Sequence, residues 1–257
     1  MRRLFACLFA LVTIPAVASA QFPPDSLKNL KVLPKNIPVR TLIDTMRTFA
    51  GALGVRCTYC HVGNEGEPLS KFDFASDKKP EKDIARTMMR MVLAINNDHL
   101  SKLTTRNDPP VVVGCATCHR GIAVPRPLQQ VVLMAYDSGG ADAGIATYRA
   151  LRQKYYGRAS YDFGEGPLTE VGSALRARQK FADAVKFYLL NTEFAPNSAF
   201  AFRAAAEGQA AAGDTAAAIV SLQHALTLNP NDQQMRRMLD MLTHAPAAPA
   251  DTIRRRP

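Results

Sequence analysis

The chain has 257 residues, and its 32 Lys and Arg against 22 Asp and Glu give a formal net charge of +10. A basic surface of this kind attracts acidic proteins, anionic membranes or nucleic acid. We expect no nucleic-acid partner, because the start of the chain predicts export from the cytoplasm. Arg2 and Arg3 belong to that export segment, so the exported chain would carry a charge of +8.

Residues 1–20 have the layout of a secretory signal peptide. Arginines at the start precede an apolar run from Leu4 to Val17, and small residues lead to Ala20, after which we predict cleavage. Cys7 lies too close to the arginines for a lipid-attachment site. The apolar run is short for a retained anchor helix and is interrupted by Pro15. The sequence therefore predicts a periplasmic protein, with membrane association as the alternative.

The motif Cys-x-x-Cys-His occurs twice, in VRCTYCHVG at 55–63 and in VGCATCHRG at 113–121. Such a motif attaches haem c, because two thiols add to the vinyl groups of haem and the adjacent imidazole binds the iron. The sequence thus predicts two covalently bound haem c groups. The predicted attachment residues are Cys57, Cys60, Cys115 and Cys118, and the predicted iron ligands beside them are His61 and His119.

Three other uses of paired cysteines are less consistent with the sequence. Two disulfides would suit an exported protein but would not require a histidine after each pair. A thioredoxin-like redox pair would be expected within alternating strands and helices, a pattern that the sequence lacks. A zinc site built from four cysteines does not explain the paired histidines and suits an exported chain poorly.

A sixth ligand on each iron decides between an electron carrier and a catalyst, and the first candidate is Met46. The segment RTLIDTMRTFAGALGV, residues 40–55, predicts an amphipathic helix that ends near Gly54, a residue suited to a left-handed cap. Core packing is the usual role of a methionine on such a face, and here the face would also cover a haem. The face consists of Leu42, Met46, Phe49 and Leu53.

A second amphipathic helix is predicted in residues 78–103, beginning at Pro80. Its apolar face offers Met88, Met91 and His99 as candidate ligands, and periodicity alone does not choose among them. A histidine near a helix end is more often a surface or capping residue, so His99 ranks lower. The full face is Ile84, Met88, Met91, Val92, Ile95, His99 and Leu103.

Three segments follow one another in residues 30–126: RTLIDTMRTFAGALGVRCTYCH, KFDFASDKKPEKDIARTMMRMVLAIN and VGCATCHRG. Together they resemble the cytochrome c subunit of photosynthetic reaction centres. In that family, one helix supplies an axial ligand and the following motif holds the same haem. The resemblance implies that Met46 completes the haem of the first motif and Met88 that of the second. Met91 and His99 remain lower-ranked alternatives. Methionine opposite histidine implies fairly positive midpoint potentials.

The sequence departs from that family in two respects. The photosynthetic subunit commonly has four haem sites, whereas this chain has two motifs. Lys102 stands where the family's bis-histidine haem takes its extra histidine, and His99 lies three residues before it. A free dihaem carrier is therefore at least as consistent with the sequence as a fixed reaction-centre subunit.

The composition changes after the second motif, where the segments IAVPRPLQQ and DSGGADAG predict a linker. We assign the dihaem domain to residues 21–128, the linker to 129–140, a helical domain to 141–244 and a disordered basic tail to 245–257.

The helical domain repeats with a period of 34 residues, which aligns Pro196 with Pro230 and Ala184 with Ala218. This period and the small residues are typical of tetratricopeptide repeats, in which each unit is a helix hairpin. Two repeats are clear, and flanking helices are expected at 142–157 and 232–242. The methionines of the last segment are expected in the core.

The predicted fold is mainly α, with a dihaem, multihaem-cytochrome-like domain followed by a short tetratricopeptide-like hairpin array. We interpret the protein as an exported dihaem c-type cytochrome that transfers single electrons and has no catalytic residues. Its expected partners are redox proteins, such as a membrane-bound reaction centre or respiratory complex, docked through the repeats, and an anionic membrane surface. The repeats could instead pack on the haem domain or form a homodimer. Two other functions stay open: a peroxidase-like dihaem enzyme, and a repeat-based assembly protein whose haems act as sensors.

Overall fold

A computed structural model of the chain describes residues 22, 26–105 and 107–244. The predicted signal peptide and the predicted basic tail lie outside these residues. The expectation of a mainly α protein is confirmed, since 65% of the structure is helical. The described residues contain no strand, and their one isolated bridge joins Val62 and Asp73. No helix in these ranges is long and apolar enough to cross a membrane.

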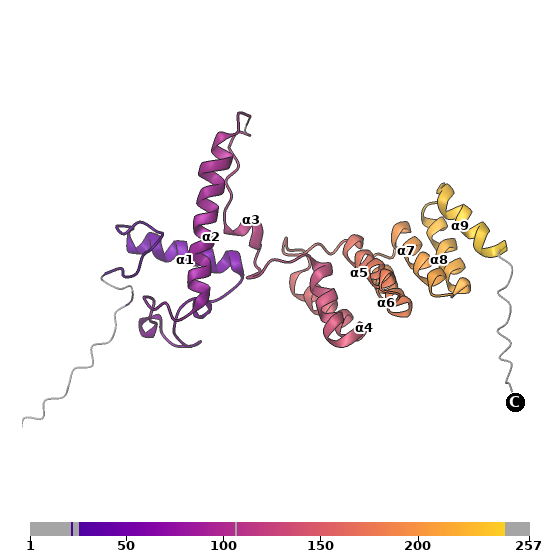
Figure 1. Cartoon of the computed structure of the whole chain (residues 1–257), viewed down its shortest axis with the longest axis horizontal. Coiled ribbons are helices and arrows are strands. Elements are labelled where there is room, and N and C mark those ends of the chain that lie inside the picture. Colours follow the sequence, from indigo (N-terminus) through magenta and orange to yellow (C-terminus); the bar gives the residue numbers. More distant parts are fainter. Residues whose placement is uncertain (1–21, 23–25, 106, 245–257) are drawn as a thin grey trace, which may run out of the picture. The chain divides into compact units, whose positions relative to one another are not determined.

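The chain divides into two compact units, unit 1 at residues 1–123 and unit 2 at residues 124–257. The division comes earlier than the predicted end of the haem domain at residue 128. Both motifs lie in unit 1, whose described α-helices appear in Figure 1. These helices are α1 (Val39–Leu53), α2 (Pro80–Ala94) and the short α3 (Cys115–His119).

The first helix, α1, ends where the sequence predicts, at a glycine with a left-handed backbone. Gly54 has φ 66° and ψ 32°, a region that glycine adopts without the steric cost of a Cβ atom. The Gly54 N–H bonds to the Gly51 carbonyl at 3.2 Å, and the Val55 N–H bonds to the Ala50 carbonyl at 3.0 Å. These two bonds form a Schellman cap, which ends the helix shortly before the first motif.

The second helix, α2, begins at Pro80 as predicted. The predicted helical face does not continue in register to Leu103, because Ile95–His99 form a π turn. A π turn contains an extra residue per hydrogen-bonded ring, so it rotates the side chains that follow it. His99 therefore leaves the face that carries Met88, and it is exposed.

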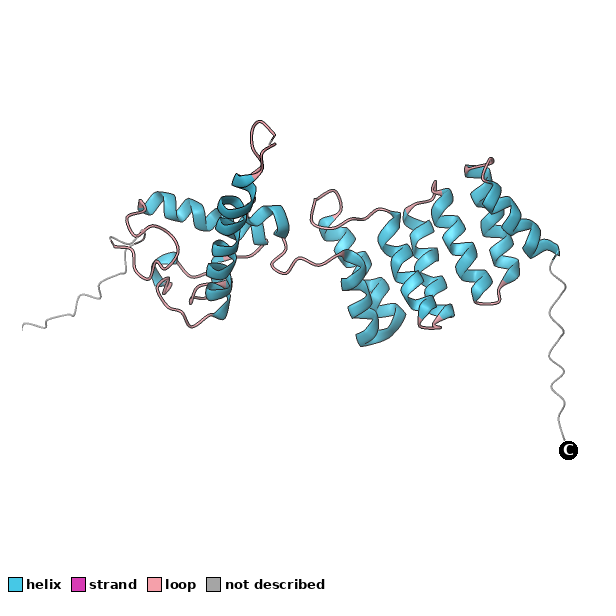
Figure 2. Ribbon diagram, turned by 45° about the horizontal axis from the view of Figure 1, so that its top comes forward, coloured by secondary structure: helices cyan, strands magenta, loops and turns pink. Residues whose placement is uncertain are grey.

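Unit 2 is a stack of antiparallel helices (Figure 2). Its first helix, α4 (Leu128–Tyr155), breaks at Gly139 and Gly140, whose backbones are not helical. The two segments of α4 fold back on each other. Gly144 of the second segment lies so close to the first that a Cβ atom there would be 3.4 Å from the Val132 carbonyl oxygen. The remaining helices are α5 (Glu165–Ala177), α6 (Phe181–Phe194), α7 (Ala199–Ala211), α8 (Thr215–Leu228) and α9 (Gln233–His244).

The structure differs from the linker predicted at 129–140. Residues 128–138 are helical, and only the two glycines leave the helical backbone. The reason is burial, because Leu128 and Val132 are 2% and 0% exposed and pack in the same apolar cluster as Phe187 of α6. The glycines thus form a tight turn within a hairpin rather than a connection between domains.

The 34-residue period is confirmed by the helix boundaries. Helices α5, α7 and α9 start at residues 165, 199 and 233, and α6 and α8 start at 181 and 215. Ala184 and Ala218, which the period aligns, are 1% and 0% exposed. Small residues at these positions let neighbouring helices approach closely, as in tetratricopeptide hairpins. Met235 of α9 is 2% exposed and Met238 packs against the same cluster, as predicted for the core. The prediction is wrong for Met241, which is 66% exposed because it lies on the outer side of the last helix.

Candidate haem-attachment site

The first motif forms one hydrogen-bonded turn. Cys57 begins a 3₁₀ helix, Cys57–Tyr59, directly after an extended Arg56. The Cys57 carbonyl accepts hydrogen bonds from the N–H of Cys60 at 3.3 Å and from the N–H of His61 at 2.9 Å. Both thiols and the imidazole therefore belong to the same turn, which is what covalent attachment to one haem requires.

The ring of His61 is packed against Phe74, in a loop that returns to the motif. The two ring centroids are 5.0 Å apart in an edge-on arrangement, and Phe72 stacks on Phe74 at 5.5 Å. Burial, helped by the positive charge of Lys82, lowers the pKa of His61 to about 4. The imidazole is therefore neutral at pH 7, and the neutral form is the one that binds a metal.

The Nδ1 atom of His61 is buried and has no hydrogen-bond partner among the described residues. The Phe74 carbonyl lies close enough to His61 to oppose the lowering of its pKa. The contact does not have the geometry of a hydrogen bond to Nδ1. This carbonyl instead accepts a hydrogen bond from Lys82 Nζ at 2.7 Å, and Lys82 also donates to the Ser76 carbonyl at 2.7 Å.

Lys82 belongs to an ionic network centred on Asp77. The Asp77 carboxylate lies 3.5 Å from Lys82 Nζ, 2.9 Å from Arg86 Nη2 and 2.7 Å from Lys31 Nζ. Arg86 is only 5% exposed, and Asn29 donates to the same carboxylate at 2.8 Å. Hydrogen bonds from Arg86 and Lys31 hold the pKa of Asp77 well below its usual range. The network therefore fixes the loop behind His61 to α2 and to the N-terminal segment.

The second motif is α3 itself, and its histidine has a different surrounding. His119 Nδ1 lies 3.0 Å from the Ile122 carbonyl, which can only accept, so Nδ1 carries the proton and Nε2 is left for a metal. The turn is stabilised at its start by Gly114, whose N–H donates to Thr117 Oγ1 at 3.0 Å.

The second motif also contacts the end of α1. The Gly121 N–H donates to the Ala52 carbonyl at 2.8 Å, a group that the end of α1 leaves without an intrahelical partner. A Cβ atom at Gly54 would lie 2.1 Å from the Gly121 carbonyl oxygen. The glycines that follow α1 and α3 thus allow the two backbones to meet.

Asn96 joins α2 to the second motif. Its Nδ2 donates to the Val113 carbonyl at 2.8 Å, and its Oδ1 accepts from the Val113 N–H at 2.9 Å. The side chain therefore pairs with the backbone just before Cys115. The sequence analysis missed this role, and the available signal was a pair of asparagines directly after the apolar run Met91–Ile95, where their helix propensity is low.

The candidate sixth ligands lie on the expected helices, and the structure does not choose among them. Met46 is partly buried on α1. Met88 and Met91 of α2 are 36% and 44% exposed. His99 is exposed in the π turn. The assignment of Met46 and Met88 stays a prediction.

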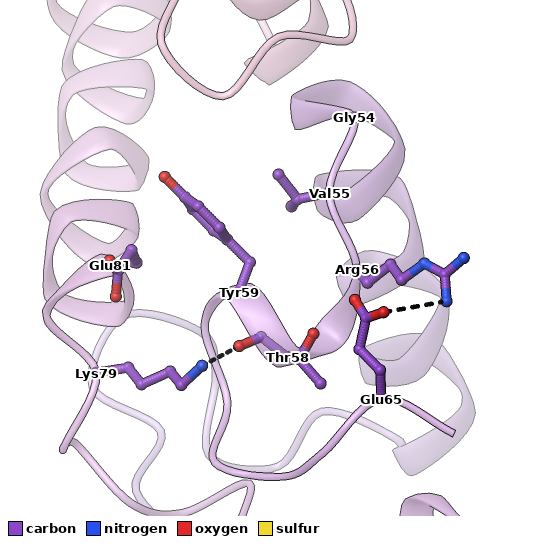
Figure 3. Close-up of a pocket in the computed structure, with 8 residues that line it drawn as sticks. All are labelled: Gly54, Val55, Arg56, Thr58, Tyr59, Glu65, Lys79 and Glu81. Atoms are coloured by element: carbon purple, nitrogen blue, oxygen red, sulfur yellow. Dashed lines mark hydrogen bonds and ion pairs between the residues drawn. The ribbon is translucent and has the colours of Figure 1, made fainter. Parts of the chain in front are cut away.

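A cleft of about 630 Å³ lies beside the first motif (Figure 3). Val55 and Tyr59 face it from the motif side, and Glu81 faces it from α2. Lys79 donates from the start of α2 to the Thr58 carbonyl. The lining residues do not include the cysteines and histidines of the motifs. The cleft is therefore bordered by the attachment turn through Thr58 and Tyr59, the two residues between its cysteines.

The donor groups fit covalently bound haem better than the alternatives. The four cysteines of the motifs are free thiols, and burial raises the pKa of Cys60 and Cys115. Among the described residues, no group of three or more His, Cys, Asp or Glu side chains could hold a metal ion. An apolar prosthetic group would cover the exposed apolar side chains of α2, which include Ile84 at 58% exposure.

A family model described as "Photosynthetic reaction centre cytochrome C subunit" matches residues 15–144 of the chain. Over 70 residues, 27% of this chain, the sequence is 43% identical to cytochrome c-554 of Chloroflexus aurantiacus, of which the match covers 14%. Over 88 residues, 31% of this chain, it is 35% identical to the photosynthetic reaction center cytochrome c subunit of Rubrivivax gelatinosus, of which the match covers 22%. The matched segments are thus a small part of these relatives.

Two solved structures show a limited similarity to part of the chain. One is the first TPR of Spaghetti (RPAP3) bound to an HSP90 peptide, with 19% identity and a TM-score of 0.33, covering 47% of this chain and 94% of that chain. Another is the first TPR domain of human RPAP3, with 18% identity and a TM-score of 0.33, covering 45% of this chain and 87% of that chain.

Proposed function

The chain belongs to the photosynthetic reaction centre cytochrome c subunit family, an electron-transfer family with covalently bound haem c, and we propose that it is an exported dihaem carrier of single electrons. The observation that carries the proposal is the doubled Cys-x-x-Cys-His motif. Each motif forms its own turn. Burial keeps the His61 imidazole neutral at pH 7, and the hydrogen bond of His119 Nδ1 to the Ile122 carbonyl leaves Nε2 as the nitrogen that could bind iron.

In this proposal the first haem is held by Cys57, Cys60 and His61, and the second by Cys115, Cys118 and His119. When bound, haem supplies a reversible one-electron couple. Met46 on α1 and Met88 on α2 would close the sixth positions and exclude water and small molecules from the iron. Sulfur ligation would also favour the reduced state and raise the midpoint potentials.

We further propose that the carrier works in the periplasm with a membrane-bound redox complex, either a reaction centre or a respiratory complex. The basic charge of the exported chain supports transient docking to an acidic surface or to anionic lipid. Unit 2 supports a docking role because its helix hairpins can present a surface without participating in haem attachment. Electron-transfer rates to the complex should therefore fall as ionic strength rises.

The first test is the haem content of the purified mature protein. A pyridine haemochrome assay and intact mass should give two haems per chain and an N-terminus at Gln21. Replacement of both cysteines by alanine in either motif should leave one haem, whereas the control Cys7→Ala should leave two. One haem in the wild type would contradict the dihaem carrier, and a retained N-terminal segment would contradict cleavage after Ala20.

The second test concerns the sixth ligands. Met46→Ala and Met88→Ala should each remove part of the weak methionine-to-iron absorption of the oxidised protein, and the control Met91→Ala should remove none. If one iron of the wild type binds carbon monoxide readily, its sixth position is open. The carrier would then be the wrong function, and a peroxidase-like enzyme or a haem sensor would be the better one.

A further inference from the structure

The two motif histidines differ in what lies beside their Nδ1 atoms. His119 Nδ1 donates to the Ile122 carbonyl at 3.0 Å. His61 Nδ1 is buried, and no described residue accepts a hydrogen bond from it. The Phe74 carbonyl, which influences the His61 ring, accepts a hydrogen bond from the ammonium of Lys82 at 2.7 Å. The Nδ1 atom of His119 therefore has an acceptor, whereas that of His61 has none among the described residues, and the carbonyl beside it accepts from a cation.

The hydrogen bond affects the iron through the basicity of the ligand. A carbonyl that accepts from Nδ1–H makes the imidazole more electron-rich, which stabilises the ferric state and lowers the midpoint potential. His119 has this support. His61 lacks it, so the haem held by His61 should have the higher potential on this ground alone.

The charges near His61 act in the same direction. The strongest electrostatic effects on its ring come from Lys82, Arg86 and Lys79, and all three are cationic. Lys82 and Arg86 have side chains only 13% and 6% exposed, so solvent screens them little. A buried positive charge disfavours the more positive ferric state and raises the potential.

Anions near the loop offset this charge only in part. Asp77 is 32% exposed and is shared among Lys31, Lys82 and Arg86. Asp83, which also pairs with Arg86 at 2.6 Å, is 68% exposed. At the second motif the adjacent cation is Arg120, which is exposed and donates to the Thr117 carbonyl at 3.4 Å. Of these cations, Lys82 and Arg86 beside the first motif are the least exposed.

We propose that Lys82, held by Asp77, makes the haem attached at Cys57 and Cys60 the higher-potential member of the pair. Lys82 acts as a positioning and electrostatic residue, since it reaches the haem through Phe74 and His61. Electron transfer inside unit 1 then runs from the second motif to the first. With both haems bound, the iron held by His119 would give up one electron, Fe(II) to Fe(III), and the iron held by His61 would accept it, Fe(III) to Fe(II). This inference rests on the dihaem function proposed above.

The test is a spectroelectrochemical titration of the full-length holoprotein. The variant Cys57→Ala retains one thioether bond and shifts the reduced absorption band of the first haem, which identifies that haem during the titration. In this background Lys82→Gln should lower the potential of the marked haem and leave the other unchanged, and Lys82→Arg should keep most of the original value. The control Lys78→Gln removes an exposed charge from the same loop and should shift neither haem.

A second variant separates electrostatics from loss of structure. Asp77→Asn removes an anion and should raise the potential of the marked haem, opposite in sign to Lys82→Gln. Equal shifts of both haems with Lys82→Gln, no shift, or a marked haem that is the lower of the two would overturn the inference. A haemochrome assay on the same samples measures the number of haems per chain. One haem per chain would overturn the dihaem function itself, whereas two haems with the wrong order of potentials would overturn only this inference.

Discussion

Units 1 and 2 are both helical, but they bury their side chains in different ways. In unit 2, Leu168, Phe187 and Leu222 are completely buried between helices. In the described part of unit 1, Ala52 is the only buried apolar residue, and the buried side chain of greatest size is the charged Arg86. Unit 2 therefore has a core made of protein alone, whereas the described part of unit 1 leaves exposed apolar side chains that a haem could cover.

The same contrast appears within single helices. On α2 the apolar residues Ile84 and Met91 are 58% and 44% exposed, although they share a helical face. On α6 the apolar residues Ala184 and Phe187 are 1% and 0% exposed. An amphipathic pattern alone therefore predicts a helix but does not say whether protein or cofactor covers its apolar side.

The largest expected effect comes from removing the haems. Replacing all four motif cysteines by alanine should abolish amide protection in α1 and α2 while α5 to α8 stay protected, because only unit 2 has its own apolar core. Hydrogen exchange with mass spectrometry measures both units in one sample. Retained protection of α1 and α2 would show that unit 1 does not depend on haem for its fold.

The second prediction concerns the core of unit 2. Phe187→Ala should destabilise this unit by about 3–5 kcal/mol, because it leaves a cavity beneath α4. Thermal unfolding followed by far-UV circular dichroism measures the loss, and the haem spectrum should not change at low temperature. Phe181→Ala on the same helix is the control, since Phe181 is 37% exposed and its loss should be small. A changed haem spectrum would argue against the independence of the two units.

The third prediction concerns the contact between α1 and the second motif. Gly54→Ala should destabilise unit 1 by about 1–3 kcal/mol from the left-handed backbone alone, and the Cβ atom would also displace Gly121. Denaturant titration of the haem absorption measures this. Gly51→Ala is the control, because it lies within α1 with nothing within 4 Å, and it should stabilise the helix by about 0.5–1 kcal/mol. Equal effects of the two substitutions would exclude a specific role for the cap.

The smallest expected effect is a loss of stability of unit 2 at acidic pH. Tyr136 donates to Asp183 at 2.9 Å, and this bond lowers the pKa of Asp183 from its usual 3.8. A lowered carboxyl pKa gives stability that is present above pH 3.8 and is lost as the pH falls through the lower, folded value. Tyr136→Phe should cost about 1 kcal/mol near neutral pH and reduce this acid dependence. Melting temperatures between pH 6 and pH 2, with Tyr156→Phe as an exposed control, provide the measurement. An unchanged acid profile in Tyr136→Phe would mean that other groups set it.

Much of the local structure was predictable from single segments. The cap at Gly54, the start of α2 at Pro80 and the repeat period all follow from residues close together in sequence. The turn at Gly139 and Gly140 was visible as a break, but it was assigned to a linker. Its place inside a hairpin depends on the burial of Leu128 and Val132 by helices that come later in the chain.

The surroundings of the motif histidines were not predictable in the same way. Lys82 looks like any other lysine near a helix start, and its role depends on the loop that brings the Phe74 and Ser76 carbonyls to it. Asn96 gains its role by pairing with Val113, and the π turn around it moves His99 off the predicted face. Pattern analysis assumes an uninterrupted α-helical period, so it could not foresee this change.

The sequence by itself determined the attachment motifs, the end of α1, the start of α2 and the repeat period, because each depends on the spacing of residues along the chain. Only the tertiary structure decided which carbonyl and which cation stand beside each imidazole, since those groups come from segments far apart in sequence. The motifs therefore specify that the chain holds haem c, and the packing around His61 and His119 distinguishes one attachment turn from the other.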